Sequence, residues 1–171
     1  MIASFGYAST TIFPTPNYNS NVEYSLFELD DDTYCLALNI YHEARGDNLA
    51  GKYAVSDVVL NRVRDIRWPD TVCDVVYQAE MKPSWKDQSK LVPIHHRCQF
   101  SWYCDGKSDL PLDQEAWYEA QVIASKMLDF ETFRGITEGA THYHAVYVNP
   151  SWNKYFHPVG RIGAHVFYRA E

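Results

Sequence analysis

Apolar residues in the second quarter of the chain recur at the spacing of a helix. Val55, Val58, Val59 and Val63 fall at positions i, i+3, i+4 and i+8, which share one face of a helix. The pattern predicts a helix that begins near Asn48 and buries its valine face in a core.

An apolar run before this helix lies between aspartates and a glycine. Residues 30–32 are aspartates, which suit the N-cap and first turn because the positive end of the helix dipole lies there. The run over residues 35–41 follows, and Gly46 readily takes the left-handed conformation that ends a helix. Glu43 is therefore expected near the C-terminal end of a mostly buried helix.

Two further helices and a long loop region are predicted in the middle of the chain. Residues 71–74 have the pattern of a helix start, followed by a short apolar segment to Tyr77. Asp113 opens the longest helical pattern, which we expect to end at Gly135. Residues 80–112 contain three prolines and are expected to be loop, and long loops tend to carry function.

The last part of the chain changes to the two-residue period of strands. Residues 141–148 alternate, so His142 and His144 face one way and Tyr143 the other, and residues 162–169 can form a second strand. Helices followed by a small antiparallel sheet near the C-terminus predict an α+β fold that is mostly helical. Residues 1–30 are interpreted as an extended arm and residues 31–171 as the folded domain.

Composition and charge exclude several classes of protein. The chain has 171 residues, enough for one domain, and its formal net charge of −7 argues against sequence-independent nucleic-acid binding. No apolar stretch approaches the ~20 residues that span a bilayer, so stable membrane insertion is not expected. The N-terminus lacks the pattern of a secretory signal, which predicts synthesis in the cytoplasm. Aromatic residues make up 15%, which suits either a tyrosine-rich core or a carbohydrate site.

The sequence does not decide how the four cysteines pair or whether they are reduced. They form no CxxC pair, and they allow three complete pairings or a reduced, buried state. A bridge among Cys73, Cys98 and Cys104 is one expectation, since Cys98–Cys104 would close a small loop, and Cys35 is then expected to be free and buried.

Glu43 is the first candidate for catalysis. Burial and the negative end of a helix dipole both disfavour a carboxylate and should raise its pKa. A carboxylic acid that stays protonated near neutral pH is what glycoside cleavage needs as its general acid. The alternative is that Glu43 pairs with Arg45 or a later arginine and ties two helices together.

Other catalytic chemistries have weaker patterns. His142 and His144 alternate on a strand, and His165 on a neighbouring strand could complete a zinc site. A thiol protease would use Cys98 or Cys104 with a histidine, without any activation signal in the sequence. No glycine-rich phosphate loop is present.

A polar and aromatic segment offers a candidate sugar-binding wall. Residues 98–106 mix rings, amides and hydroxyls, which can stack on sugar faces and bond their polar groups. Because Phe100 and Trp102 alternate with Gln99 and Ser101, one set is expected to be core and the other site.

Several short sequence motifs resemble those of one protein family. Residues 34–169 are similar to the cell-wall hydrolases typified by the spore-cortex-lytic enzyme, the SleB type. The motifs on which the resemblance rests include Ile40-Tyr-His-Glu-Ala-Arg-Gly46, Cys98-Gln-Phe-Ser-Trp102, Ala140-Thr-His-Tyr-His-Ala145 and Arg161-Ile-Gly-Ala-His-Val-Phe167. The resemblance implies a lysozyme-like α+β fold, cleavage of the glycan strands of peptidoglycan, and Glu43 as the catalytic acid.

The resemblance also implies a mechanism and a set of partners. Neither Asp47 nor Asp105 sits in an evident second-carboxylate motif, so a lytic transglycosylase is favoured over a muramidase. No metal or cofactor is expected, and the protein is expected to be a monomer. The expected substrate-binding residues are Gln99, Phe100, Ser101, Trp102, His142, Tyr143, His144 and Trp152.

The biological setting has two alternatives and one competing class. A short domain of this kind resembles a bacteriophage endolysin, released to the wall from the host cytoplasm, or a virion-associated lysin. The competing enzyme is a zinc-dependent wall amidase or peptidase that uses His142, His144 and His165. The competing non-enzyme is a wall-binding or virion structural protein.

Overall fold

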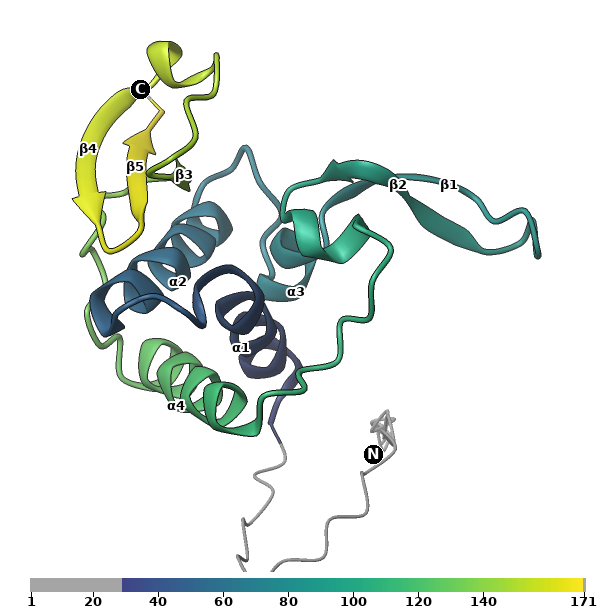
Figure 1. Ribbon diagram of the computed structural model, residues 1–171, viewed down its shortest axis with the longest axis horizontal. Helices are drawn as coiled ribbons and strands as arrows, with labels where there is room; N and C mark the ends of the chain where they lie inside the picture. Colours follow the sequence, from purple (N-terminus) through teal and green to yellow (C-terminus); the bar gives the residue numbers. More distant parts are fainter. Residues whose placement is uncertain (1–28, 171) are drawn as a thin grey trace, which may run out of the picture.

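The computed structural model describes residues 29–170, which fold into a helical body, a projecting hairpin and a small C-terminal sheet (Figure 1). The helices are α1 (Asp31–Ala44), α2 (Leu49–Arg64), α3 (Val72–Val76) and α4 (Gln114–Asp129), and the strands are β1 (Ala79–Pro83), β2 (Leu91–Cys98), β3 (His142–Ala145), β4 (His157–Ile162) and β5 (His165–Arg169). Short 3-10 turns occupy Ser101–Cys104 and Asn153–Tyr155. This α+β architecture confirms the expected fold class. The arm expected over residues 1–30 lies outside the described residues except for its last two positions.

Local side-chain caps start the four helices where the sequence predicts. Asp30, Asn48, Thr71 and Asp113 each accept a hydrogen bond from the backbone N–H three residues on. These caps satisfy backbone donors that a helix leaves unpaired. The end of α4 differs from the prediction, because the helix stops at Asp129 and tight turns lead on to Gly135.

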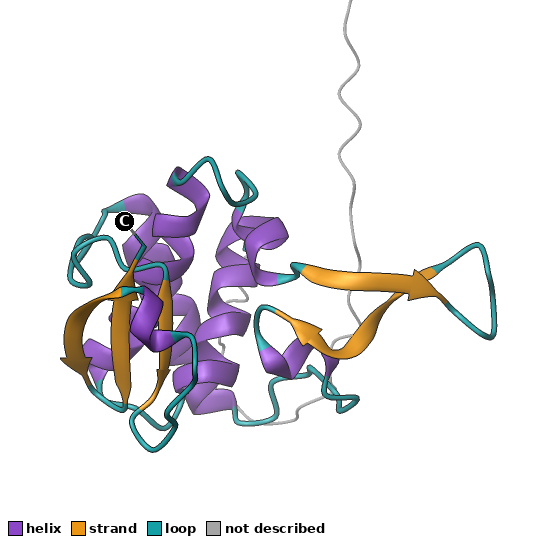
Figure 2. Cartoon of the chain, turned by 90° about the horizontal axis from the view of Figure 1, so that it is seen from above, coloured by secondary structure: helices purple, strands orange, loops and turns teal. Residues whose placement is uncertain are grey.

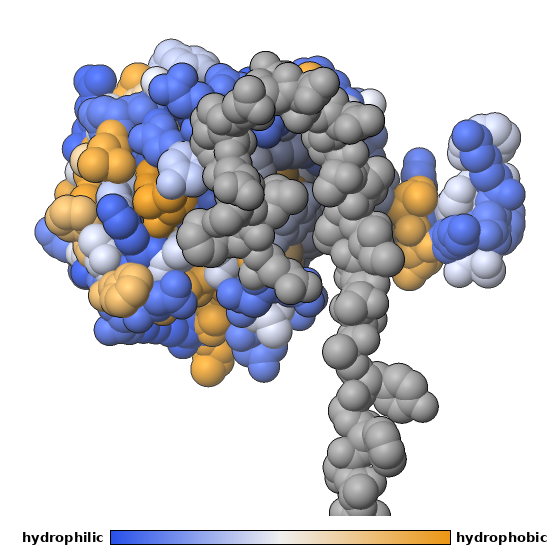
Figure 3. Space-filling model, turned by 90° about the horizontal axis from the view of Figure 1, so that it is seen from below, coloured by the Kyte–Doolittle hydropathy of each residue, from blue (hydrophilic) through white to orange (hydrophobic). Residues whose placement is uncertain are grey.

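Helix α1 lies at the centre of the body and contacts α2, α3 and α4. The main core gathers fully buried side chains from all four helices, among them Leu36, Ile40, Val59, Val75 and Ile123. A smaller core joins α2 to the C-terminal sheet through Val58 and Phe167. The valine face of α2 thus packs as the periodicity predicts. On the face in Figure 3, hydrophobic side chains of the described residues lie in small separate groups among hydrophilic ones.

A hairpin replaces part of the expected loop. Strands β1 and β2 pair antiparallel and extend away from the helices (Figure 2). The expectation of loop over residues 80–112 is wrong for its first half. That expectation relied on Pro83 and Pro93 as signs of a loop. Both strands of an isolated hairpin are edge strands, where proline is tolerated.

The C-terminal sheet has the strand order β3-β5-β4, all antiparallel. Strands β3 and β5 were predicted, whereas β4 was missed because Pro158 lies within it. In the register, Tyr143 lies opposite Phe167 and Ala145 lies opposite His165. These pairs share one face of the sheet, since directly opposed residues point the same way.

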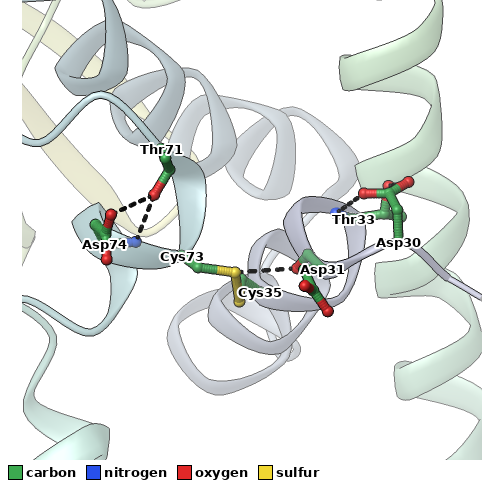
Figure 4. The surroundings of a disulfide bond; sticks show 7 residues. All are labelled: Asp30, Asp31, Thr33, Cys35, Thr71, Cys73 and Asp74. Atoms are coloured by element: carbon green, nitrogen blue, oxygen red, sulfur yellow. Dashed lines mark hydrogen bonds between the residues drawn. A yellow bond between two sulfur atoms is a disulfide. The ribbon is translucent and has the colours of Figure 1, made fainter. Parts of the chain in front are cut away.

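Two disulfides use all four cysteines. Cys35–Cys73 joins α1 to α3 across 38 residues of sequence (Figure 4), and Cys98–Cys104 closes the predicted small loop. The expectation of a free Cys35 is wrong. Packing of α1 against α3 brings the Cα atoms of Cys35 and Cys73 to 5.2 Å, which local sequence spacing does not reveal. Within residues 29–170, no helix has the length and apolar character needed to span a membrane.

Candidate active site

A cleft of about 840 Å³ runs along the C-terminal end of α1. Its walls come from the segment 98–102, from the loop 105–113 and from β3 with the turn that follows. The cleft therefore gathers residues that are far apart in the sequence, and it includes Glu43.

Glu43 occupies the last turn of α1 and is half-buried. The Tyr143 hydroxyl donates a hydrogen bond to Glu43 Oε2 at 3.2 Å. Burial raises the pKa of the Glu43 carboxyl, and the Tyr143 hydrogen bond and the positive charge of Arg62 offset part of that rise. Arg45, one of the partners considered for a structural pair, instead stacks on the Tyr41 ring at 4.9 Å and donates to its carbonyl. Arg62, a later arginine, does act on Glu43 through its charge.

Arg62 supplies a buried positive charge to the cleft wall. Its guanidinium lies 4.3 Å from the Trp68 ring and 5.2 Å from the Phe100 ring, and its Nε donates to the Thr141 carbonyl at 2.8 Å. Burial lowers the pKa of Arg62 to about 10, so the side chain stays charged at neutral pH. Its Nη1 is buried and has no hydrogen-bond partner among the described residues. Sequence reasoning missed Arg62, whose position in the apolar pattern of α2 signals only a helix end.

The predicted sugar-binding segment has exposed polar side chains that alternate with buried rings. Gln99 and Ser101 are exposed and line the cleft. Phe100 and Trp102 are only 3% and 7% exposed. Trp102 donates its indole N–H to Asn39 Oδ1 at 3.1 Å, and the His42 ring stacks on it at 4.6 Å.

The expected stacking of Phe100 and Trp102 on sugar is therefore corrected. Both rings belong to the hydrophobic core and contribute little exposed surface to the cleft that they line. The expectation that one set is core is confirmed, and the binding role of Gln99 and Ser101 stays a prediction.

Strand β3 brings two of its predicted residues to the cleft. Tyr143 and His144 line it, whereas His142 lies in a second pocket. Trp152 lines neither space and packs against His142 and His144 at 5.7 Å from each ring. The predicted substrate-binding residues of β3 are therefore divided between the cleft and the second pocket.

The three histidines of the zinc alternative do not converge. His142 and His144 share one face of the sheet, while His165 lies opposite Ala145 on the face that holds Tyr143. His165 Nδ1 lies 3.2 Å from Asp47 Oδ2. Across residues 29–170 no group of three histidine, cysteine or acidic side chains is placed to hold a metal ion. The zinc hypothesis thus lacks its geometry.

Asp47, considered as a second carboxylate, ties two turns together. Its carboxylate accepts the Ala164 N–H at 2.9 Å and is enclosed by Gly51 and Gly163, where a Cβ atom would collide with it. It lies outside the cleft. Asp105 and Asp109 do line the cleft, and burial raises the pKa of Asp109. Asp109 is a candidate that sequence reasoning did not single out.

Known proteins resemble this chain in sequence and in fold. A family model described as cell wall hydrolase matches residues 46–168, a range that begins three residues after Glu43. The spore cortex-lytic enzymes of Oceanobacillus iheyensis and Halalkalibacterium halodurans are 38% and 39% identical over 37% and 29% of this chain. Those alignments span only 22% and 15% of the relatives' own lengths.

Solved structures agree with the fold. The catalytic domain of the germination-specific lytic transglycosylase SleB from Bacillus anthracis superposes with a TM-score of 0.57 at 23% identity, covering 86% of this chain and all of that one. The catalytic domain of the Bacillus cereus SleB protein gives 0.56 at 24% identity, covering 81% of this chain and 89% of that one. At these identities the likeness establishes the fold.

Proposed function

The chain belongs to the cell wall hydrolase family, and from this premise we propose that it is a lytic transglycosylase of bacterial peptidoglycan. The proposed bond is the β-1,4 link between N-acetylmuramic acid and N-acetylglucosamine, and Glu43 is the proposed general acid and base. The observation that carries the proposal is a half-buried Glu43 with a raised pKa in the wall of a long cleft. The spore cortex-lytic relatives and the SleB fold neighbours support the choice of substrate.

In the first step, Glu43 donates its proton to the bridging oxygen as the bond to the anomeric carbon breaks. The sugar passes through an oxocarbenium-like state, and Glu43 is left as a carboxylate. The Tyr143 hydroxyl and the Arg62 charge both favour that carboxylate, and both are already in place. Stabilisation that is in place before charge develops costs little reorganisation.

In the second step, Glu43 accepts the proton of the muramic 6-hydroxyl. The freed oxygen attacks the anomeric carbon and closes a 1,6-anhydro ring, so no water is consumed. Asp47, which could otherwise activate water, is held by Ala164 and His165 outside the cleft. Hydrolysis as a muramidase is the second candidate, since Asp105 and Asp109 share the cleft with Glu43.

The role as an endolysin or virion-associated lysin is a separate proposal. Two disulfides suit a protein that works in an oxidising compartment, such as the space outside the bacterial membrane. Lysis of host cells by protein produced within them, compared with protein added outside, tests this role.

Mass spectrometry of the soluble products from purified sacculi tests the enzymatic proposal. We expect anhydro-muropeptides from the native protein and none from Glu43→Gln. Reducing muropeptides would instead establish the muramidase. Freed peptides with intact glycan, or activity that a chelator abolishes, would overturn both glycosidase mechanisms.

A further inference from the structure

A second pocket of about 310 Å³ adjoins the cleft and is used by none of the steps above. Gln99 lines both spaces. Arg62 in the cleft wall stacks on Trp68, which lines the second pocket. The second pocket and the cleft therefore share part of their walls.

Three rings form the walls of the second pocket. His142 stacks on Phe156 at 4.1 Å and lies 5.8 Å from the Trp68 ring. Burial and the nearby charges of Arg62 and Arg67 lower the pKa of His142 to about 4, so its ring is neutral at neutral pH. The ring part of the wall is thus uncharged and flat, which suits an apolar group attached to a sugar, and Arg67, which is paired with Asp65, adds a cation to the lining.

Gln78 lines this pocket and carries a polar atom without a partner in residues 29–170. Its Oε1 is buried and has no hydrogen-bond partner within the described part of the chain. The backbone carbonyl of Gln78 accepts the Gln99 N–H at 2.9 Å, which fixes the two glutamines side by side. A buried acceptor without a donor leaves its lost hydration uncompensated, so a ligand N–H that reaches Gln78 Oε1 would be favoured.

We propose that this pocket binds the acetamido group of an N-acetylhexosamine residue next to the sugars held at Glu43. The acetamido methyl fits against the three rings, and the acetamido N–H donates to Gln78. An acetamido group carries both a donor and a carbonyl acceptor, so it satisfies the Gln78 amide in either orientation. The pocket volume lies at the small end of ligand sites, as expected for one substituent and part of its sugar. This proposal rests on the proposed function, because it takes the glycan strand as the substrate.

Binding of free N-acetylglucosamine gives the first test. The probe is titrated into isotope-labelled native protein, and the Trp68 indole N–H signal, assigned with Trp68→Phe, is followed. We expect N-acetylglucosamine to shift this signal and glucose, which lacks the acetamido group, to leave it unchanged. Gln78→Leu should weaken binding about tenfold, the equivalent of one hydrogen bond.

The matched control is Gln88→Leu, because Gln88 is an exposed glutamine in the hairpin turn that lines neither pocket. It should bind the probe like the native protein. Gln78→Met serves as a second variant if Gln78→Leu loses its native circular dichroism spectrum. An equal shift with glucose, or unchanged affinity in the folded Gln78 variant, would overturn the proposal.

Kinetics on long glycan strands give the second test. Gln78→Leu should raise KM about tenfold and leave kcat unchanged, because the pocket lies away from the breaking bond. A protein that binds the probe at Trp68 but releases no product from sacculi would contradict the proposed function and keep this pocket. Product release with no response at Trp68 would do the reverse.

Discussion

Asp57 on α2 and Glu43 on α1 are carboxylates of neighbouring helices with opposite surroundings. Asp57 is 0% exposed, and its two oxygens accept four hydrogen bonds. The donors are the Arg134 guanidinium, the Gly135 N–H at 3.0 Å, the Thr137 N–H at 3.1 Å and the Thr137 hydroxyl at 2.6 Å. This carboxylate joins α2 to the turns after α4.

Glu43 accepts one hydrogen bond from a side chain, and the Arg62 Nη1 nearby has no partner in the described residues. Burial raises the pKa of the Glu43 carboxyl because few donors replace the water that it loses. At Asp57, donors from the protein replace the water lost on burial, and the carboxylate stabilises the fold. Burial with few donors favours the protonated form of Glu43, which is the form that the proposed general acid needs.

Replacing Glu43 by glutamine should have the largest effect on activity. Glutamine keeps the size of the side chain but cannot transfer the proton. We expect a loss of about two to four orders of magnitude in the rate of sacculus lysis, the usual contribution of general acid catalysis. Turbidity clearance by protein with a native circular dichroism spectrum measures it. A folded variant that lyses at the native rate would remove Glu43 from the mechanism.

The same substitution should raise stability at neutral pH. The folded-state pKa of Glu43 lies above its unfolded value, so the native state binds the proton more tightly. Stability from this group therefore falls as pH rises from about 4.5 through the folded pKa. Glutamine does not titrate, so thermal melts should show Glu43→Gln gaining on the native protein as pH increases.

Asp57→Asn should show the opposite pattern. Removing one partner of a buried ion pair leaves the Arg134 charge unpaired, which costs about 3–5 kcal/mol in the free energy of unfolding. Activity per folded molecule should stay at the native level. Urea unfolding measures the loss. The matched control is Glu131→Gln, which breaks the exposed Arg64–Glu131 pair and should change stability little.

The two disulfides should divide in the same way between fold and site. In the chain-entropy model, loss of Cys35–Cys73 costs about 4 kcal/mol and loss of Cys98–Cys104 about 2 kcal/mol, because the loops differ in length. Of the four cysteines, only Cys98 lines the cleft, so Cys98→Ala with Cys104→Ala should also reduce lysis. Thiol counting on unfolded, unreduced protein checks both bridges, and four free thiols would contradict them.

Tyr143→Phe should act through Glu43 and should reduce activity less than Glu43→Gln does. It deletes the hydroxyl that favours the Glu43 carboxylate, a hydrogen bond to a charged group worth about 1.5–3 kcal/mol, or roughly tenfold to hundredfold in kcat/KM. Loss of this bond raises the Glu43 pKa further. The free enzyme needs a protonated Glu43, so the alkaline limb of the kcat/KM profile should move to higher pH. An unmoved limb would show that Tyr143 does not control this proton.

The sequence predicted the caps, the position of Glu43 and the alternation of β3, because these features depend on residues within a few positions of one another. The cap between Asp30 and Thr33, for example, joins residues only three positions apart. The hairpin was not predicted because proline usually indicates a loop. Proline is also tolerated in edge strands, and both strands of this hairpin are edge strands.

Local sequence determined that Glu43 ends a buried helix and that Tyr143 and His144 lie on opposite faces of a strand. Tertiary structure alone decided that Tyr143 reaches Glu43 across 100 residues, that Arg62 stands beside them, and that Gln78 and Gln99 adjoin. It also decided the pairing of Cys35 with Cys73 and the removal of Asp47 from the cleft. The physical reason is that helix caps and strand periodicity arise from neighbours along the chain. The charge balance of a site, in contrast, depends on which distant elements exclude water from it.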